Sequence, residues 1–247
     1  MVCNRHKFNF LYRRFLIKVR IEKTWQNYWD RHKNHQYGAC FANHDLKKFY
    51  INIPKCASNW GKFVFKHNLK WESTNYHDAK LLKQGYTAIV FLRNPIDRWA
   101  SGMAEYIDRY GYNVKSFTHQ LEKQQLALDI INKTAAFDEH TVEQITFLED
   151  LDTDATTWFS IESDLNQNVA DYVRRELGIE NDISELPIIE NIIIGEPMYT
   201  SVRDKDKDQN KQWFLDNIIR FTSIEKHFKL DIDLYNNVKF YTGDFKL

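Results

Sequence analysis

Glycine, proline and cysteine are all scarce in this sequence of 247 residues, which contains 8, 4 and 3 of them. So few glycines and prolines exclude collagen-like architectures and proline-rich linkers. The three cysteines, at positions 3, 40 and 56, are too few for a disulfide scaffold and lack the spacing of zinc ligands. We therefore expect a reduced, cytoplasmic setting and predict no metal site.

Long apolar runs and an excess of one charge are also missing. No run of about 18 apolar residues occurs, so no transmembrane helix is predicted. The 34 basic side chains match 34 acidic ones, which excludes a uniformly basic nucleic-acid-binding protein. With 43% hydrophobic and 15% aromatic residues, the chain can form a core, and its length fits one large domain with a short appendage.

The balanced total charge hides a basic N-terminus. Residues 1–35 carry nine Lys or Arg side chains against two acids, a net charge of +7, so the remainder carries −7. Phe8, Leu11, Phe15 and Val19 recur at helical spacing and predict an amphipathic helix with a basic face. Basic residues interrupt this stretch, so it is not a signal peptide.

Two interpretations of this basic helix stay open. It packs on the flank of the domain as an ordinary solvated helix, or it contacts an anionic partner or the surface of a membrane. We treat residues 1–40 as a basic helical extension and residues 41–247 as the main domain.

From residue 49 onward, predicted strands alternate with predicted helices. The strands cover residues 49–53, 87–92 and 157–161, and the helices cover 60–69, 97–110, 116–131, 142–148, 165–177 and 212–234. Asp164 is predicted to cap the helix over 165–177, and Gly178 to end it. The segment from 188 to the charged run 203–211 is predicted to be loop. This alternation predicts an α/β domain with a parallel sheet that helices cover on both faces.

Two loops that follow predicted strands contain a proline and carry candidate ligands for an anion. The carboxyl ends of parallel strands line the ligand crevice of such a fold. The first loop reads Pro54-Lys55-Cys56-Ala57-Ser58-Asn59 and leads into a helix. A helix N-terminus offers backbone N–H groups to an anion, and Lys55, Ser58 and Asn59 add side-chain donors. The loop is not a Walker A motif, because Phe63 occupies the position of the hydroxyl that would bind Mg²⁺.

The second loop reads Arg93-Asn94-Pro95-Ile96-Asp97-Arg98-Trp99-Ala100-Ser101. Arg93 ends a predicted strand, and Ser101 lies in the helix that follows, from which it can reach back to the same site. A guanidinium and a hydroxyl that converge on one anion suit a phosphate. Arg98 is either a third donor to the anion or the partner of a nearby acid.

Together the two loops resemble the cofactor-binding motifs of sulfotransferases that use 3′-phosphoadenosine 5′-phosphosulfate (PAPS), and in particular the carbohydrate sulfotransferase-like branch. That family has a Pro-Lys loop for the 5′-phosphosulfate and an Arg-x-Pro-x-x-Arg-x-x-Ser segment for the 3′-phosphate. The matching residues are Pro54, Lys55, Ala57 and Ser58 in the first motif and Arg93, Pro95, Arg98 and Ser101 in the second. Asn59 departs from the Ser or Thr that the family usually has.

The resemblance implies a P-loop-type fold and the transfer of a sulfuryl group from PAPS to a hydroxyl acceptor, which is a sugar in this branch of the family, without a metal. Lys55 would stabilise charge on the oxygen that leaves with the phosphate. Residues 138–144 resemble the family's His-x-x-Pro-Gln segment, with Glu143 in place of Pro, which makes His140 the candidate general base. Glu139, Asp138 and Glu105 are competing candidates.

Several alternatives remain at this point. The chain is either such an enzyme, a P-loop kinase or nucleotidase, or a nucleotide-binding protein of the same fold that has lost activity. Cys56 acts as a thiolate or as a small packing residue, and Trp60 and Trp99 stack on adenine or pack in the core. The lack of a membrane anchor, unlike Golgi members of the family, suggests either a bacterial or viral source or a shortened chain.

Overall fold

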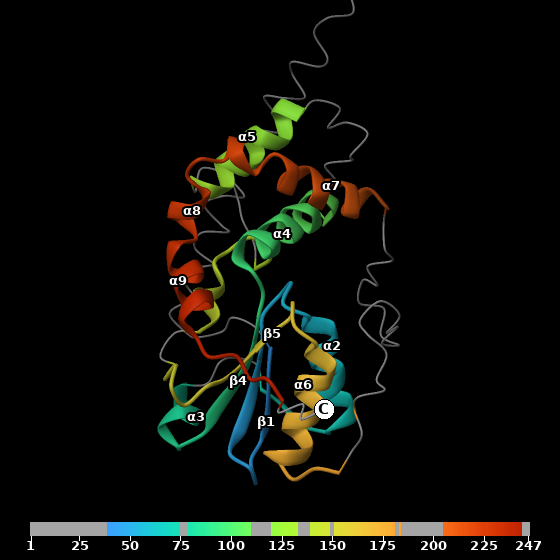
Figure 1. Ribbon diagram of the computed structural model, residues 1–247, viewed down its shortest axis with the longest axis vertical. Coiled ribbons are helices and arrows are strands. Elements are labelled where there is room, and N and C mark those ends of the chain that lie inside the picture. Colours follow the sequence, from blue (N-terminus) through green and yellow to red (C-terminus); the bar gives the residue numbers. More distant parts are fainter. Residues whose placement is uncertain are drawn as a thin grey trace, which may run out of the picture.

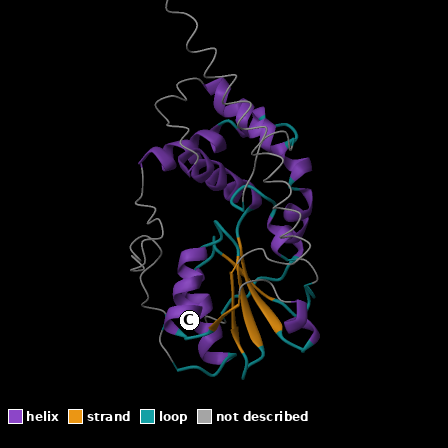
Figure 2. Cartoon of the chain, turned by 180° about the vertical axis from the view of Figure 1, so that it is seen from behind, coloured by secondary structure: helices purple, strands orange, loops and turns teal. Residues whose placement is uncertain are grey.

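A computed structural model describes residues 39–74, 79–109, 120–132, 139–148, 151–180, 183 and 205–243. The basic N-terminal helix predicted within residues 1–35 lies outside these ranges, and so does the segment 188–202, which the sequence assigns to loop. In the described part, a five-stranded sheet is flanked by helices, and further helices lie beyond one end of the strands (Figures 1 and 2). Among the described residues, no helix is long and apolar enough to span a membrane.

The sheet is mixed, and its strand order is β3-β1-β2-β4-β5. The strands are β1 (Ala39–Asn43), β2 (Lys48–Asn52), β3 (Glu72–Thr74), β4 (Thr87–Leu92) and β5 (Thr157–Ser160). As predicted, β2, β4 and β5 run parallel. The prediction of a wholly parallel sheet is wrong, because β1 pairs antiparallel with both β2 and β3. Only the residues 44–47 connect β1 to β2, and so short a connection joins antiparallel neighbours.

The helices confirm the alternation that the sequence predicts and correct several of its boundaries. They are α2 (Ser58–Lys62), which continues as the π-helix η1 (Phe63–Asn68), α3 (Ala79–Lys83), α4 (Pro95–Arg109), α5 (Gln120–Ile131), the 3₁₀ helix η2 (Gln144–Phe147), α6 (Leu165–Arg175), α7 (Lys205–Asp216), the 3₁₀ helix η4 (Ile218–Arg220), α8 (Ile224–His227) and α9 (Lys229–Asn237). The helix predicted over 212–234 is thus four shorter segments. The first of these, α7, begins inside the charged run that the sequence assigns to the end of a loop.

The predicted ends of α6 are half right. Gly178 follows the helix with a φ of +65°, the left-handed conformation that favours glycine after a helix. Asp164 occupies the N-cap position, but its side chain makes no capping hydrogen bond and its φ is +20°. The predicted capping role of Asp164 is therefore wrong.

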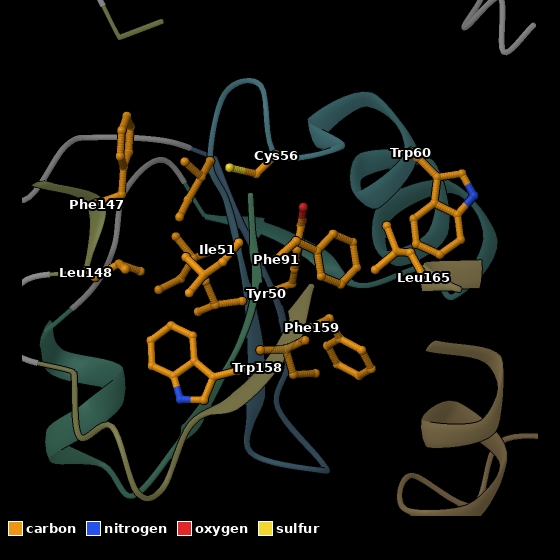
Figure 3. Packing of buried hydrophobic residues seen from close by; sticks show 14 of the residues in the cluster. Tyr50, Ile51, Cys56, Trp60, Phe91, Phe147, Leu148, Trp158, Phe159 and Leu165 are labelled. Carbon is orange, nitrogen blue, oxygen red and sulfur yellow. The ribbon is translucent and has the colours of Figure 1, made fainter. Parts of the chain in front are cut away.

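The core consists of aromatic and aliphatic side chains on both faces of the sheet. Figure 3 shows Trp60 and Leu165 on one side of the strands and Phe147, Leu148 and Trp158 on the other. The residues Trp60 and Leu165 belong to α2 and α6, which cover that face (Figure 1). The prediction that helical segments cover both faces is consistent with this packing.

Two tryptophans that could have stacked on a nucleobase are core residues. Trp60 is fully buried, and its ring lies 5.7 Å from that of Phe91. Trp99 on α4 is 1% exposed and packs edge-on against Phe214 and Phe221, with centroid distances of 5.3 and 5.2 Å. These contacts attach α4 to the C-terminal helices, so that α4 is held firmly above the carboxyl ends of β4 and β5 (Figure 1).

Candidate functional site

The two loops singled out in the sequence meet at the carboxyl edge of the parallel strands. They follow β2 and β4, which are neighbours in the sheet. One guanidinium nitrogen of Arg93, Nη1, donates a hydrogen bond to the backbone oxygen of Lys55 at 3.3 Å. Residues 38 positions apart in the sequence are therefore in direct contact, as the two-motif interpretation requires.

The first loop has an unusual backbone. Lys55 and Ala57 have φ values of +68° and +53°, a left-handed conformation that side chains other than glycine seldom adopt. Cys56 closes the turn between them by donating its N–H to the oxygen of Ile53 at 3.1 Å. Strained positions of this kind cluster at ligand-binding sites. The turn delivers the chain to α2, whose N-cap is Ala57 and whose first turn contains Ser58 and Asn59.

The thiol of Cys56 supports the loop and is not a reactive thiolate. It is fully buried, and Sγ donates a hydrogen bond to Oε1 of Gln144 at 3.0 Å. Burial raises the pKa of this thiol to about 12, since a charged sulfur is disfavoured away from water. Of the two interpretations that the sequence left open, this geometry favours a small packing residue.

Gln144 joins the two loops. Besides the thiol of Cys56, its Oε1 accepts the N–H of Arg93 at 3.1 Å, and its Nε2 donates to the oxygen of Arg93 at 2.9 Å. Its own backbone N–H and that of Ile145 donate to the carboxylate of Asp231 on α9, at 2.7 and 2.8 Å. Burial raises the pKa of Asp231, although these two hydrogen bonds oppose the shift. Neither Gln144 nor Asp231 was predicted as a site residue; the glutamine of the His-x-x-Pro-Gln-like segment was the available signal.

Arg98 of the second loop is buried against the backbone of other segments. Its side chain is 1% exposed, and its guanidinium donates to three backbone oxygens. Nε contacts Pro54 at 3.0 Å, Nη2 contacts Glu139 at 3.1 Å, and Nη1 contacts Val142. These hydrogen bonds link the first loop and the segment 139–142 to α4, and they favour a positioning role for Arg98 over the predicted binding of phosphate.

Arg93 is the more exposed of the two arginines of the second loop. Its side chain is 17% exposed, and Nη2 lies 3.9 Å from Oδ2 of Asp97. The buried Nε has no hydrogen-bond partner among the described residues. A buried donor without a partner is uncommon in a native protein and is consistent with a ligand or water at this position.

Ser101 shares one face of α4 with two acids. Positions four apart on a helix lie above one another, so Ser101 is one turn from Asp97 and one turn from Glu105. Asp97 meets Arg93 of the second loop, and Glu105 meets Lys55 of the first. The hydroxyl of Ser101 thus lies on the helix face that both loops approach.

Lys55 extends from the first loop to α4. Its Nζ donates to Oε2 of Glu105 at 3.0 Å, and the same oxygen accepts a hydrogen bond from Lys207 on α7 at 3.2 Å. Glu105 is buried, whereas the side chains of Lys55 and Lys207 are 20% and 19% exposed. Glu105, named in the sequence as a competing base, is here the shared partner of two ammonium groups.

His140 lies in a buried turn that packs on α4. Its Nδ1 is 3.8 Å from Oε1 of Glu139. Gly102 of α4 allows this close approach, because a Cβ at position 102 would overlap the backbone oxygen of His140. Arg98 connects the same turn to the first loop. Asp138, another competing base, lies outside the described residues.

The site therefore consists of three segments, the loops after β2 and β4 and the turn 139–144, held together by buried polar side chains. Among the described ranges, no three His, Cys, Asp or Glu side chains are grouped so that they could hold a metal ion. No family model matches the chain, and no curated protein and no solved structure matches it either. The assignment of a function thus depends on the residues of the site.

Proposed function

We propose that this protein is a sulfotransferase that transfers a sulfuryl group from PAPS to a hydroxyl group, most simply that of a carbohydrate. The observation that carries the proposal is the contact between the two loops, in which Arg93 donates to the backbone of Lys55. Each loop on its own is a weak signal. Their contact at the carboxyl ends of adjacent parallel strands supports a single site for a ligand with two anionic groups.

In this proposal Lys55 and the first turn of α2 bind the 5′-phosphosulfate. Ser58 and Asn59 lie in that turn, where backbone N–H groups have no partner within the helix. Arg93 and Ser101 bind the 3′-phosphate, and Arg98 is a positioning residue because backbone oxygens occupy its guanidinium.

The chemical step is an in-line displacement at sulfur. The acceptor oxygen forms a bond to sulfur, the bond from sulfur to the bridging oxygen breaks, and adenosine 3′,5′-bisphosphate leaves. Lys55 stabilises the negative charge that develops on the bridging oxygen. His140, as the general base, takes the proton of the acceptor hydroxyl.

A calorimetric titration tests the nucleotide specificity. We expect adenosine 3′,5′-bisphosphate to bind at least tenfold more tightly than adenosine 5′-phosphate, because loss of one charged hydrogen-bond partner costs about 1.5–3 kcal/mol. Arg93→Ala removes most of this preference, whereas the control Arg175→Ala, on the distant helix α6 beside Asp171, preserves it. Equal affinity for the two nucleotides in the unmodified protein contradicts the site, and preferential binding of ATP with Mg²⁺ favours the kinase or nucleotidase alternative.

A turnover assay with PAPS and a panel of oligosaccharides tests the chemistry. We expect Lys55→Ala to lower kcat by about 10²–10³, with a smaller change in nucleotide affinity, because its contact strengthens in the transition state. His140→Ala is expected to lower the rate by about 10²–10⁴, the usual contribution of a general base. Tight binding of the bisphosphate without turnover of any acceptor favours the inactive nucleotide-binding alternative.

A further inference from the structure

Two lysines of α7 contact the same face of α4 that the two loops approach. Lys207 Nζ lies 3.2 Å from Oε2 of Glu105, and Lys211 Nζ lies 3.4 Å from Oδ1 of Asp97. The two helices pack against each other, as Figure 1 shows. Because the later lysine meets the earlier acid, α7 runs antiparallel to α4 at this contact.

Each of these acids also meets a cation of one candidate loop. Glu105 is shared by Lys55 and Lys207, and Asp97 is shared by Arg93 and Lys211. The two ammonium nitrogens at Glu105 lie within about 6 Å of each other, since 3.0 and 3.2 Å separate them from one oxygen. One phosphate or sulfate group is small enough to contact both ammonium groups at once.

Ser101 lies midway between the two acids. Asp97 and Glu105 are about 12 Å apart along α4, at a rise of about 1.5 Å per residue, and Ser101 is one turn from each. The cations of the two loops and those of α7 therefore lie on two sides of Ser101, the residue that is proposed to bind a phosphate. The α7 lysines are accessible to a ligand, since the side chain of Lys207 is 19% and that of Lys211 is 29% exposed.

We propose that Lys207 and Lys211 form the second wall of the anion site and bind the ligand directly, Lys207 at the 5′-phosphosulfate beside Lys55 and Lys211 at the 3′-phosphate beside Arg93. This inference rests on the proposed function for the identity of the ligand. In the ligand-free protein, Glu105 and Asp97 hold the four cations in place and compete with the ligand for them. One cation is enough to balance the charge of a carboxylate, so the need to pair the buried Glu105 and the partly exposed Asp97 does not by itself account for two cations at each acid.

Substitution of each lysine tests the direct contact. Titrations with adenosine 3′,5′-bisphosphate and with inorganic pyrophosphate are expected to show about five- to tenfold weaker binding for Lys207→Gln, the size of one charge-assisted hydrogen bond. Lys211→Gln is expected to weaken the binding of the bisphosphate more than that of pyrophosphate. Lys207→Arg, which keeps the charge, should retain most of the affinity.

Lys123 provides the matched control. Its Nζ donates to Oδ1 of Asn210 on α7 at 2.7 Å and lies 5.4 Å from the ring centre of Trp213. Lys123→Gln therefore disturbs the packing of α7 on α5 without removing a cation from Asp97 or Glu105. We expect its affinity for both probes to stay within twofold of that of the unmodified protein. An equal loss for Lys123→Gln and Lys207→Gln would overturn the proposal, because it would assign the effect to the position of α7.

A double substitution separates direct binding from an effect through Glu105. Glu105→Gln is expected to strengthen binding of both probes several-fold, because a competing carboxylate is removed. In that background Lys207→Gln still weakens binding about fivefold if Lys207 touches the ligand. If the loss disappears in the double variant, Lys207 acts only through Glu105, and the proposal is wrong.

The two probes distinguish a failure of this inference from a failure of the proposed function. Pyrophosphate binding that depends on Lys207, without any advantage for the bisphosphate, supports the α7 wall and contradicts the nucleotide assignment. Tight binding of the bisphosphate that is indifferent to both lysines supports the nucleotide assignment and overturns the α7 wall. No binding of either probe overturns both.

Discussion

The face of the sheet beneath α2 and η1 and the carboxyl edge of the same sheet are both buried, but different interactions hold them together. On the face, aromatic rings pack directly against one another: the ring centre of Tyr50 lies 4.5 Å from that of Phe65 and 4.8 Å from that of Phe91. At the edge, Arg98 and Gln144 are almost fully buried and make hydrogen bonds to the backbone of the loops. The face requires only apolar side chains that fit together.

The edge is the more costly arrangement. Removing a guanidinium, an amide and a carboxylate from water is unfavourable unless each is fully hydrogen-bonded. Arg98 and Gln144 make their hydrogen bonds to the two loops that carry the predicted anion-binding residues, and Asp231 fixes the backbone of Gln144. Such a network holds loops in one geometry. The difference between face and edge therefore supports the proposed binding of a ligand at the edge, whereas the face serves stability.

The largest expected effect separates the two regions directly. Arg98→Met should destabilise the protein by about 3–5 kcal/mol, because three backbone oxygens lose a buried cationic donor. Phe65→Ala, on the face, should cost about as much through the cavity it creates. Urea denaturation measures both losses. At urea concentrations where both variants are folded, only Arg98→Met should bind adenosine 3′,5′-bisphosphate more weakly than the unmodified protein. If the two variants bind it with equal affinity, the polar network of the edge is merely structural.

The second prediction concerns the side chain that joins the loops. Gln144→Leu leaves the N–H and the oxygen of Arg93 without their partner, which should cost about 2–3 kcal/mol in the free energy of unfolding. Because Arg93 is then held less firmly, the preference for the bisphosphate over adenosine 5′-phosphate should also decline. Asn168→Leu, a buried polar residue on α6 whose Oδ1 accepts the N–H of Gly243, is the control. It should lower stability without changing the preference; a parallel change in both variants would contradict the role of Gln144.

The third prediction tests the contact between α4 and the turn that contains His140. Gly102→Ala places a Cβ against the backbone oxygen of His140, and overpacking of this kind costs about 1–3 kcal/mol. Thermal denaturation should show the loss. The turn should shift away from α4, so turnover in the sulfotransferase assay should decline more than nucleotide affinity. Unchanged stability would mean that the turn moves freely and that Gly102 does not fix it.

Local signals in the sequence were sufficient for the elements that carry the two loops. The strand Thr87–Leu92 was predicted with its observed ends, and the strand after residue 48 within one residue. Both are apolar runs that end near a proline, so that their limits depend on neighbouring residues. The strand Ala39–Asn43 was missed because it is short and mixes polar with apolar residues. Its conformation depends on pairing with two other strands, which the local sequence does not show.

The roles within the site depended on contacts between distant segments. The sequence motif assigns Arg98 to a phosphate, whereas the structure surrounds it with backbone oxygens from positions 41 to 44 residues away. An arginine suits either a phosphate or backbone oxygens, and only the packing of the turn 139–142 on α4 decides between the two partners. The part of the helix Lys205–Asp216 that precedes Gln212 was likewise missed, because its charged residues hide the buried Asn210, although α7 packs on α4 through Phe214.

The smallest expected effect uses the pKa of Cys56, at the point where the edge meets the apolar core. Burial raises this pKa from 9.0 to about 12. Below pH 9 the thiol is protonated in both the folded and the unfolded protein. As the pH rises above 9, the unfolded protein loses this proton and the folded protein retains it until about pH 12, so stability must decline with pH. At pH 10, one unit above the pKa of the unfolded protein, the loss is about 1.4 kcal/mol. Cys56→Ser keeps a donor for Gln144 but does not ionise in this range, so its stability should lack this part of the decline with pH.

The measurement is the difference in unfolding free energy between the unmodified protein and Cys56→Ser, taken at pH 7 and again at pH 10. Comparing the two proteins cancels the contribution of the buried tyrosines. An unchanged difference would mean that Cys56 is more accessible to water than its burial implies.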